Sequence, residues 1–135
     1  MDCYLNVVSI KKHLFSGHIK KIYITGYKGV LNIYPGHTPL LTTIKPGLLS
    51  IFTISKKKLL YISYGILEVQ PSVINILPDE GCFLSDLNYD KLIYKKKYME
   101  KKILQLNETE KKNLQIKLLD IQIQIKLLQE KYNID

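Results

Sequence analysis

Short hydrophobic runs fill residues 1–85, and the pattern changes near residue 86. The runs are rich in Val, Ile, Tyr and Thr, and all seven glycines and all five prolines punctuate them. Short β-branched and aromatic runs bounded by turn residues are typical of strands in a β-sandwich or barrel. We therefore predict strands at residues 4–8, 19–25, 40–44, 48–54, 59–64, 66–70 and 73–77.

Two turns stand out between these predicted strands. Residues 33–41 (IYPGHTPLL) contain two prolines and a glycine, which exclude a helix and predict a rigid loop. His37 lies at the tip of this loop, where a lone histidine more often packs or forms a hydrogen bond than binds a metal. Residues 55–58 include three lysines and predict a solvated hairpin turn that protects a sheet edge.

Residues 86–135 have a helical composition, because they lack Gly and Pro and are rich in Lys, Leu, Ile, Gln and Glu. Asp86 or Asn88 can cap a first helix that runs to about Leu106, and the polar residues 107–110 can cap a second. The predicted fold class is α+β. A β-sandwich at residues 1–85 is followed by an antiparallel two-helix hairpin at residues 86–135.

The second predicted helix is apolar on two sides. Residues 121–125 alternate Ile and Gln, which alone would suit a strand, but the long flanks favour a helix. One stripe can pack against the first helix, and the other requires the sandwich or a different subunit. The stripes are Leu114, Leu118, Ile121, Ile125, Leu128 and Tyr132, and Ile116, Leu119, Ile123 and Leu127, while the first helix offers Leu92, Met99, Ile103 and Leu106.

Composition and motifs argue against several classes of site. All 20 basic residues are lysine, which disfavours bidentate phosphate recognition despite the net charge of +8. No segment reaches the roughly 20 apolar residues of a membrane span, and no signal peptide is evident, so we expect a cytoplasmic location. Cys3 and Cys82 should then remain unpaired, and no metal cluster is visible. Without a phosphate loop, nucleophile elbow or catalytic constellation, we predict a non-catalytic protein with no cofactor.

Several segments together resemble the epsilon subunit of the bacterial proton-translocating ATP synthase. They lie in family order within roughly residues 3–88, and they are LNVVS at 5–9, FSG at 15–17, TG at 25–26, IYPGHTPLL at 33–41, IKPG at 44–47 and GILEVQP at 65–71. The resemblance implies a rotor subunit whose sandwich binds the gamma subunit and the c ring, coupling proton flow to ATP synthesis. It also implies a hairpin that extends to the catalytic alpha and beta subunits and inhibits ATP hydrolysis. The location it implies is peripheral, at the cytoplasmic face of the bacterial inner membrane.

The resemblance also assigns contact residues by position. The gamma contacts would be Ser9, His37, Thr42 and Ser63, and the c-ring contacts would be Lys28, Gly29 and Val30. The hairpin would contact an acidic loop of the catalytic subunits through Lys111, Lys112, Lys117 and Lys126. Val30 replaces a common glutamate, which argues against a charged ring contact, and Asn32 and Tyr64 replace usual glycines.

Some family members bind ATP through an Asp-x-x-Arg-Ala segment at the start of the first helix. The matching positions here are Asn88, Lys91 and Leu92, and all three differ. Lys91 lacks the arginine fork and Leu92 is bulkier than alanine, so we do not expect specific ATP binding. Read from the residues alone, this segment is a helix cap and first turn.

Two other classes of protein remain as alternatives. With 10 tyrosines and a positive charge, a small β domain could bind single-stranded nucleic acid. The lysines are spread over both parts of the chain and do not gather around an aromatic platform, which argues against this alternative. The second alternative is a coiled-coil assembly factor whose hairpin binds the partner while the sandwich only supports it.

Overall fold

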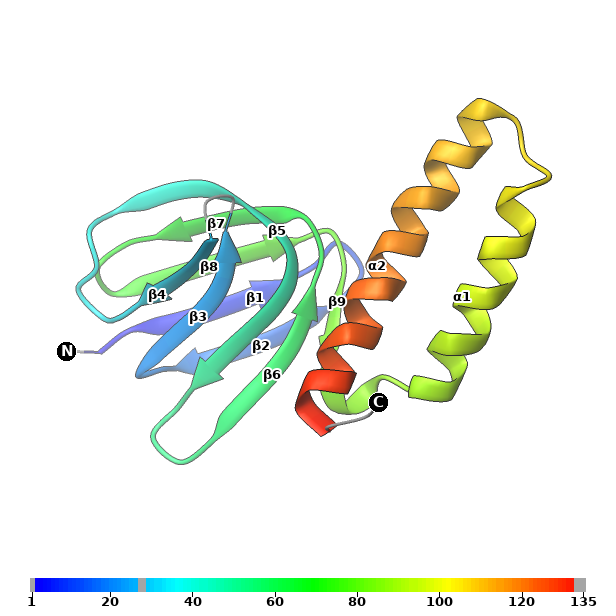
Figure 1. The fold of residues 1–135 in the computed structure, drawn as a ribbon. Coiled ribbons are helices and arrows are strands. Elements are labelled where there is room, and N and C mark those ends of the chain that lie inside the picture. Colours follow the sequence, from blue (N-terminus) through cyan, green and yellow to red (C-terminus); the bar gives the residue numbers. More distant parts are fainter. Residues whose placement is uncertain (1, 27–28, 133–135) are drawn as a thin grey trace. The chain divides into compact units, whose positions relative to one another are not determined.

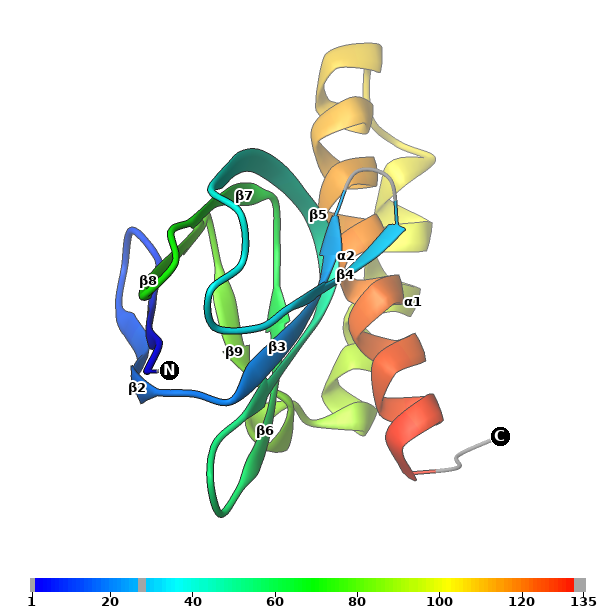
Figure 2. The same ribbon diagram turned by 90° about the vertical axis from the view of Figure 1, so that its left-hand side faces the viewer.

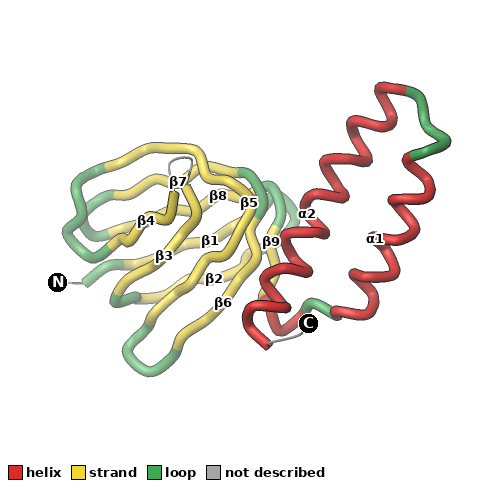
Figure 3. Tube along the Cα trace, viewed as in Figure 1, coloured by secondary structure: helices red, strands yellow, loops and turns green. Residues whose placement is uncertain are grey.

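The computed structural model describes residues 2–26 and 29–132 of the chain. It contains two compact units, Met1–Phe83 and Leu84–Asp135 (Figure 1). Colouring by secondary structure shows that the first unit is built from strands and the second from helices (Figure 3). The predicted α+β fold, a β-sandwich followed by two helices, is confirmed.

The first unit is a nine-stranded sheet within the described residues. Its strands are β1 (Tyr4–Val8), β2 (His13–His18), β3 (Lys21–Gly26), β4 (Gly29–Ile33), β5 (Leu40–Phe52), β6 (Lys57–Ile62), β7 (Gly65–Val69), β8 (Val73–Pro78) and β9 (Gly81–Phe83). They follow the order β2-β1-β8-β7-β5-β3-β4, and β6 pairs with β5 and β9. The sheet curls, so that β1, β2 and β8 form one side and β3, β4 and β5 the other (Figure 2).

Strand β5 joins the two sides of the sandwich. Its first part, from Leu40 to Ile44, pairs with β7, and its last part, from Gly47 to Phe52, pairs with β6. Pro46 lies at the changeover, where a missing N–H is tolerated because the strand is exchanging neighbours. Gly47 also allows close approach, because a Cβ there would lie 2.8 Å from Thr25 Oγ1. The prediction of two separate strands at 40–44 and 48–54 was therefore wrong, since one strand of 13 residues runs through both and ends at Phe52.

Three strands were missed, and some predicted boundaries were displaced. Strands β2 and β4 lie at the two ends of the sheet path and carry Gly and polar residues, so their strand signal is weak. Strand β9 has only three residues. The predicted lysine turn at 55–58 is shorter than expected, because Lys57 and Lys58 already belong to β6. The Thr53 N–H closes this turn by donating to the Lys56 carbonyl at 2.9 Å.

The core of the sandwich consists of side chains at alternate strand positions. Fully buried examples include Leu5, Ile22, Ile51 and Ile74, each at 0% exposure. Each such side chain contributes about 1.5 to 3 kcal/mol when it leaves water. Cys3 belongs to this core, and burial raises the pKa of its thiol. It is not joined to Cys82 by a disulfide.

The predicted loop between two strands lies between β4 and β5. The His37 N–H donates to the Tyr34 carbonyl at 3.1 Å, and Gly36 adopts a φ of 81°. Pro35 followed by a glycine with positive φ is typical of a type II turn. The Gly36 N–H donates to the Pro71 carbonyl at 2.8 Å, which fastens the turn to the β7–β8 connection.

The second unit contains α1 (Tyr89–Ile103) and α2 (Glu108–Tyr132), preceded by a short 3-10 helix, Leu84–Asp86. Asn88, not Asp86, caps α1, because its side chain accepts from the Lys91 N–H at 3.0 Å. Asn107 caps α2 by accepting from the Glu110 N–H at 2.9 Å, and it donates back to the Glu110 carboxylate at 2.7 Å. This reciprocal pair is a variant of the capping box.

The two helices form a hairpin, and α2 has apolar residues on two sides. Gln129 near the end of α2 donates to the Tyr89 hydroxyl at the start of α1 at 3.3 Å, so the helices run antiparallel. In the first predicted stripe, Ile121, Ile125 and Leu128 are buried. In the second stripe Ile116 and Leu119 are exposed. No helix within the described residues has the length and apolar character needed to cross a membrane.

The close approach of β7 and β8 gives a stability prediction at Gly65. An added Cβ would lie 2.3 Å from the Leu77 carbonyl oxygen, and backbone atoms cannot swing away. We expect Gly65→Ala to lower the free energy of unfolding of the sandwich by about 3 kcal/mol. Hydrogen exchange of the buried strand amides in the full chain measures this free energy.

Gly17→Ala is the matched control, because its added Cβ would meet only the Phe15 ring, at 3.3 Å. It should change the same free energy by less than about 1 kcal/mol. Equal effects of the two substitutions would show that the β7–β8 contact does not require glycine.

Candidate functional site

The outer face formed by β1, β2, β7, β8 and the first part of β5 carries exposed apolar side chains. Leu77 lies opposite Ile66 across the β7–β8 pair, and Ile66 lies opposite Thr43 across the β5–β7 pair. The exposed fractions are 50% for Leu77, 47% for Ile66, 72% for Leu41 and 37% for Val8. We call these four residues the outer apolar face. A set of apolar side chains on one sheet face is typical of a protein-docking surface.

A row of hydrogen-bonded polar side chains crosses the same face over four strands. Ser16 on β2 donates to the Asn6 side chain on β1 at 3.0 Å, and Asn6 donates to Asn75 on β8 at 3.2 Å. Asn75 in turn donates to the Glu68 carboxylate on β7 at 2.9 Å. The Ser16 hydroxyl proton is used toward Asn6, so the hydrogen bond between Ser16 and His13 requires a proton on His13 Nε2.

This polar row determines what the outer face can do. Its side chains satisfy one another, so they hold the four strands in register and leave few groups for new hydrogen bonds. The Glu68 carboxylate is engaged by the Asn75 side chain. No group of three or more His, Cys, Asp or Glu that could hold a metal occurs among the described residues. Docking of a protein is the chemistry that this face supports.

Two of the expected gamma contacts, Ser9 and Ser63, are buried in turns. The Ser9 hydroxyl donates to the Lys12 carbonyl at 3.1 Å and accepts from the Lys12 N–H at 3.2 Å. The Ser63 hydroxyl makes the same pair of bonds with the Glu80 backbone, at 3.2 and 2.8 Å. Both serines stabilise the turns beneath a surface, and their hydroxyls are not presented to a partner.

The other two expected gamma contacts, Thr42 and His37, are half-buried. Thr42 lies opposite the buried Leu67, so the outward positions of β5 belong to its neighbours Leu41 and Thr43. His37 donates through Nδ1 to the Thr38 carbonyl at 2.7 Å, which leaves Nε2 as the ring acceptor in the neutral form.

The four expected gamma contacts do not form one cluster. Strands β1 and β8 are parallel, so Ser9 lies at the end of the sheet where β8 finishes. Ser63 lies at that end too, because it bonds to Glu80. The turn before His37 bonds to Pro71, which precedes β8, and therefore belongs to the opposite end.

Of the three expected c-ring contacts, Lys28 lies outside the described residues. Gly29 begins β4 with a φ of 121°, a conformation that favours glycine. Val30 is 67% exposed. This position therefore offers an apolar contact, and the valine had already argued against a charged contact with the ring. Asn32 is exposed on β4, and Tyr64 is 48% exposed just before Gly65.

On α2, three of the four expected lysines are exposed, and Lys111 is half-buried. Helical spacing places Lys112, Ile116, Leu119, Ile123 and Lys126 on one side of the helix. We call these five residues the lysine-flanked face. At the start of α1, Lys91 is exposed and Leu92 is buried, so the altered nucleotide segment forms a helix cap and first turn.

Sequence reasoning missed the outer apolar face. The signal was present, because β7 and β8 carry apolar residues at consecutive positions, Ile66 with Leu67 and Ile76 with Leu77. Residues of opposite parity point to opposite faces of a sheet. One member of each pair therefore had to lie outside the core.

Comparisons with known proteins agree with this geometry. A chain of the Euglena gracilis mitochondrial ATP synthase, solved as an assembly of OSCP, F1 and c ring, superposes with a TM-score of 0.81. It is 21% identical, and the match covers 94% of this chain and 81% of that one. A chain of the Tetrahymena thermophila mitochondrial ATP synthase central stalk and c ring gives a TM-score of 0.57 at 15% identity, over 64% and 69% of the two chains. The sequence model of the ATP synthase delta/epsilon chain β-sandwich domain matches residues 2–84. The chain therefore belongs to the ATP synthase delta/epsilon family.

Proposed function

We propose that this chain is a non-catalytic central-stalk subunit of a proton-translocating ATP synthase. The observation that carries the proposal is the family match over residues 2–84, since it covers the whole strand unit. The likeness to the Euglena chain extends to 94% of this chain and so includes the helices. As a stalk subunit it would link gamma to the c ring, peripheral to the cytoplasmic face of a bacterial inner membrane.

The outer apolar face is the gamma-binding surface in this proposal. Its apolar side chains would be buried on binding, and the polar row from Ser16 to Glu68 keeps them in a fixed array. Ser9 and Ser63 would act beneath the contact by holding the turns at the end of the sheet. His37 would contribute at its margin, and Thr42, which alternates with the outward-facing Leu41 and Thr43, would act from beneath the contact.

The β3–β4 hairpin approaches the c ring in this proposal. Lys28, Gly29 and Val30 remain the contact residues proposed from the family resemblance. The exposure of Val30 supports an apolar contact with the ring loops.

The hairpin is proposed to inhibit ATP hydrolysis by extending to the catalytic alpha and beta subunits. The lysine-flanked face supports this role, because it combines exposed Ile116 and Leu119 with Lys112 and Lys126. Lys111 and Lys117 add charge beside it. Exposed ion pairs contribute only about 0 to 1 kcal/mol each, so several lysines must act with apolar burial. Nucleotide sensing is not part of the proposal, since Asn88 and Leu92 are engaged in the helix cap and in burial.

The gamma contact is tested by introducing charge into the outer apolar face. Ile66→Asp and Leu77→Asp should each weaken binding of the full chain to purified gamma at least about tenfold, because a carboxylate would be desolvated in the interface. Both side chains are exposed, so the sandwich should still fold. Isothermal titration measures the affinity, and circular dichroism checks the fold.

Ile54→Asp is the matched control, because Ile54 is 86% exposed but lies in the β5–β6 turn, outside the outer apolar face. It should bind gamma as the unmodified chain does. Normal gamma binding by both Asp variants of the outer apolar face would show that gamma binds to another surface.

Binding of single-stranded DNA in place of gamma would favour the nucleic-acid alternative. Binding of the partner by the isolated hairpin alone would favour the assembly factor.

The hairpin's role is tested by truncation in the reconstituted enzyme. Deleting residues 86–135 should raise the ATP hydrolysis rate, and high salt should partly reproduce the effect by screening the lysines. Changing Lys111, Lys112, Lys117 and Lys126 to Gln should raise it to an intermediate level.

The control for charge is Lys95→Gln with Lys97→Gln, two exposed lysines on α1, compared with the two-charge variant Lys112→Gln with Lys126→Gln on α2. The α1 pair should leave the hydrolysis rate unchanged. An unchanged rate after truncation would show that the hairpin is a structural appendage. Tight ATP binding by the isolated chain would contradict the loss of nucleotide sensing.

A further inference from the structure

A row of lysine and aromatic side chains lies at the other end of β5, away from the β7 pairing. Lys21 on β3 is paired with Phe52 on β5, and Phe52 is paired with Lys57 on β6. The Lys21 ammonium lies 4.6 Å from the centre of the Phe52 ring, and that of Lys57 lies 5.3 Å from it. Lys21 also donates to the Tyr23 hydroxyl at 2.8 Å. We call Lys21, Tyr23, Phe52 and Lys57 the lysine–aromatic row.

The electrostatics of this row come from lysines and tyrosines. The hydrogen bond from Lys21 lowers the pKa of Tyr23 and raises the pKa of Lys21, and Tyr34 and Lys57 act on Tyr23 in the same direction as Lys21. Within the described residues, the interactions of Lys21 and Lys57 involve Tyr23 and Phe52, and no carboxylate neutralises either ammonium. Two positive charges therefore lie against the Phe52 ring, and none of the described interactions pairs either of them with a carboxylate.

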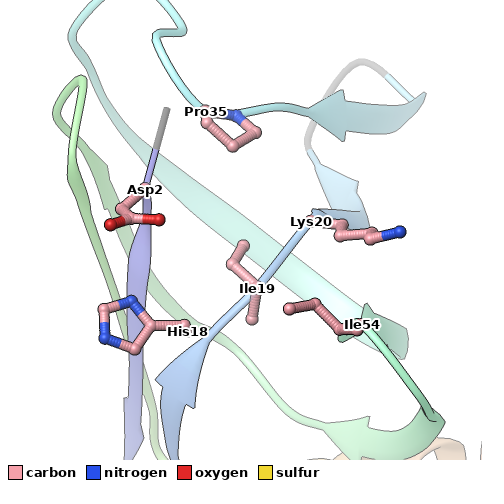
Figure 4. A pocket seen from close by; sticks show the side chains of 6 residues that line it. All are labelled: Asp2, His18, Ile19, Lys20, Pro35 and Ile54. Atoms are coloured by element: carbon pink, nitrogen blue, oxygen red, sulfur yellow. The ribbon is translucent and has the colours of Figure 1, made fainter.

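A depression of about 440 Å³ adjoins the row. Its apolar lining comes from Ile19, Pro35 and Ile54, and its polar lining comes from Asp2, His18 and Lys20 (Figure 4). The depression continues from two members of the row: Lys20 precedes Lys21 and donates its N–H to the Phe52 carbonyl at 2.7 Å, and Ile54 lies two residues beyond Phe52. Ile54 is 86% exposed and supplies part of the apolar lining of the depression.

This combination fits one kind of ligand better than the alternatives. A single-stranded nucleic acid would stack its bases on aromatic rings, but ammonium groups already lie over the Tyr23 and Phe52 rings. A membrane surface is flat and would leave the depression empty. A protein segment can place carboxylates on the lysines and insert an apolar side chain into the hollow.

We propose that the lysine–aromatic row and its adjoining depression form a docking site for an acidic segment of a partner protein. Carboxylates of the segment bind Lys21 and Lys57, and one apolar side chain enters between Ile19, Pro35 and Ile54. The site is separate from the outer apolar face, and the proposal does not depend on the rotor assignment.

The probe is a short fluorescent peptide in which glutamates alternate with leucines, titrated against the full chain by anisotropy. Replacing Lys21 and Lys57 together by Gln should weaken binding about tenfold, because two charge contacts are lost. Ile54→Ser should weaken it severalfold by removing one wall of the depression. A peptide with Gln in place of Glu, or Ser in place of Leu, should bind more weakly to the unmodified chain.

The matched control is again the pair Lys95→Gln and Lys97→Gln, which removes the same charge from α1. It should leave peptide binding unchanged. A charge-reversed chain, Lys21→Glu with Lys57→Glu, should lose the acidic peptide and gain a peptide that alternates lysine with leucine. A misfolded chain would lose binding of the acidic peptide, but it would not gain binding of the basic one. The gain therefore separates charge reversal from misfolding.

Three results would overturn the proposal. The first is an equal loss in the row variant and the α1 control, which would indicate diffuse charge attraction. The second is failure of the acidic peptide to bind the unmodified chain. The third is row-dependent binding of phosphatidylserine vesicles or of a single-stranded oligonucleotide in place of the peptide. Gamma binding is measured separately with the Ile66 and Leu77 variants, so failure here is distinguishable from failure of the rotor assignment.

Discussion

The sandwich depends on one strand that belongs to both of its sides. Strand β5 pairs with β7 along its first part and with β3 and β6 along its last part, so the curl of the sheet occurs within it. Pro46 and Gly47 allow this exchange of neighbours, one by lacking a donor and the other by admitting Thr25. Because each half of β5 lies in a different neighbourhood, the two candidate docking surfaces occupy opposite ends of the same strand.

Much of the fold could be predicted from the sequence because local signals agreed with tertiary packing. Alternating apolar residues located β1, β7 and β8, and loss of Gly and Pro located the helices. From the sequence, either Asp86 or Asn88 could be the N-cap of α1. The hydrogen bond from the Lys91 N–H to the Asn88 side chain identifies Asn88 as the cap. Edge strands β2 and β4 were missed because their residues have weak strand propensity. They form strands because each is hydrogen-bonded to a neighbouring strand, which the local sequence does not reveal. The unity of β5 was hidden by Pro46, which in isolation indicates a break.

The candidate site was less predictable, for a physical reason. Family resemblance assigned polar positions such as Ser9 and Ser63, whose hydroxyls are consumed by the Lys12 and Glu80 backbones. The exposed side chains next to the sheet's polar row are apolar and look like core residues in the sequence. Which of two neighbouring apolar residues faces outward depends on strand register, and register is set by pairing with distant segments. Lys21 and Phe52 are likewise brought together only by the β3–β5 pairing.

The arrangement of α2 bears on how a regulatory helix can exchange partners. Ile121, Ile125 and Leu128 are buried, whereas Ile116 and Leu119 stay in contact with water. Full burial of such a side chain is worth about 1.5 to 3 kcal/mol, and Ile116 and Leu119, which are 57% and 45% exposed, have about half of that left to gain. Shifting a two-state equilibrium from 1:99 to 99:1 requires about 5.5 kcal/mol of differential binding. The exposed pair alone therefore supplies only part of the energy of a conformational switch, and further contacts, including those of nearby lysines, must supply the rest. A helix with only one apolar side would have to give up its buried contacts before gaining new ones, whereas α2 can begin a new contact while keeping the old.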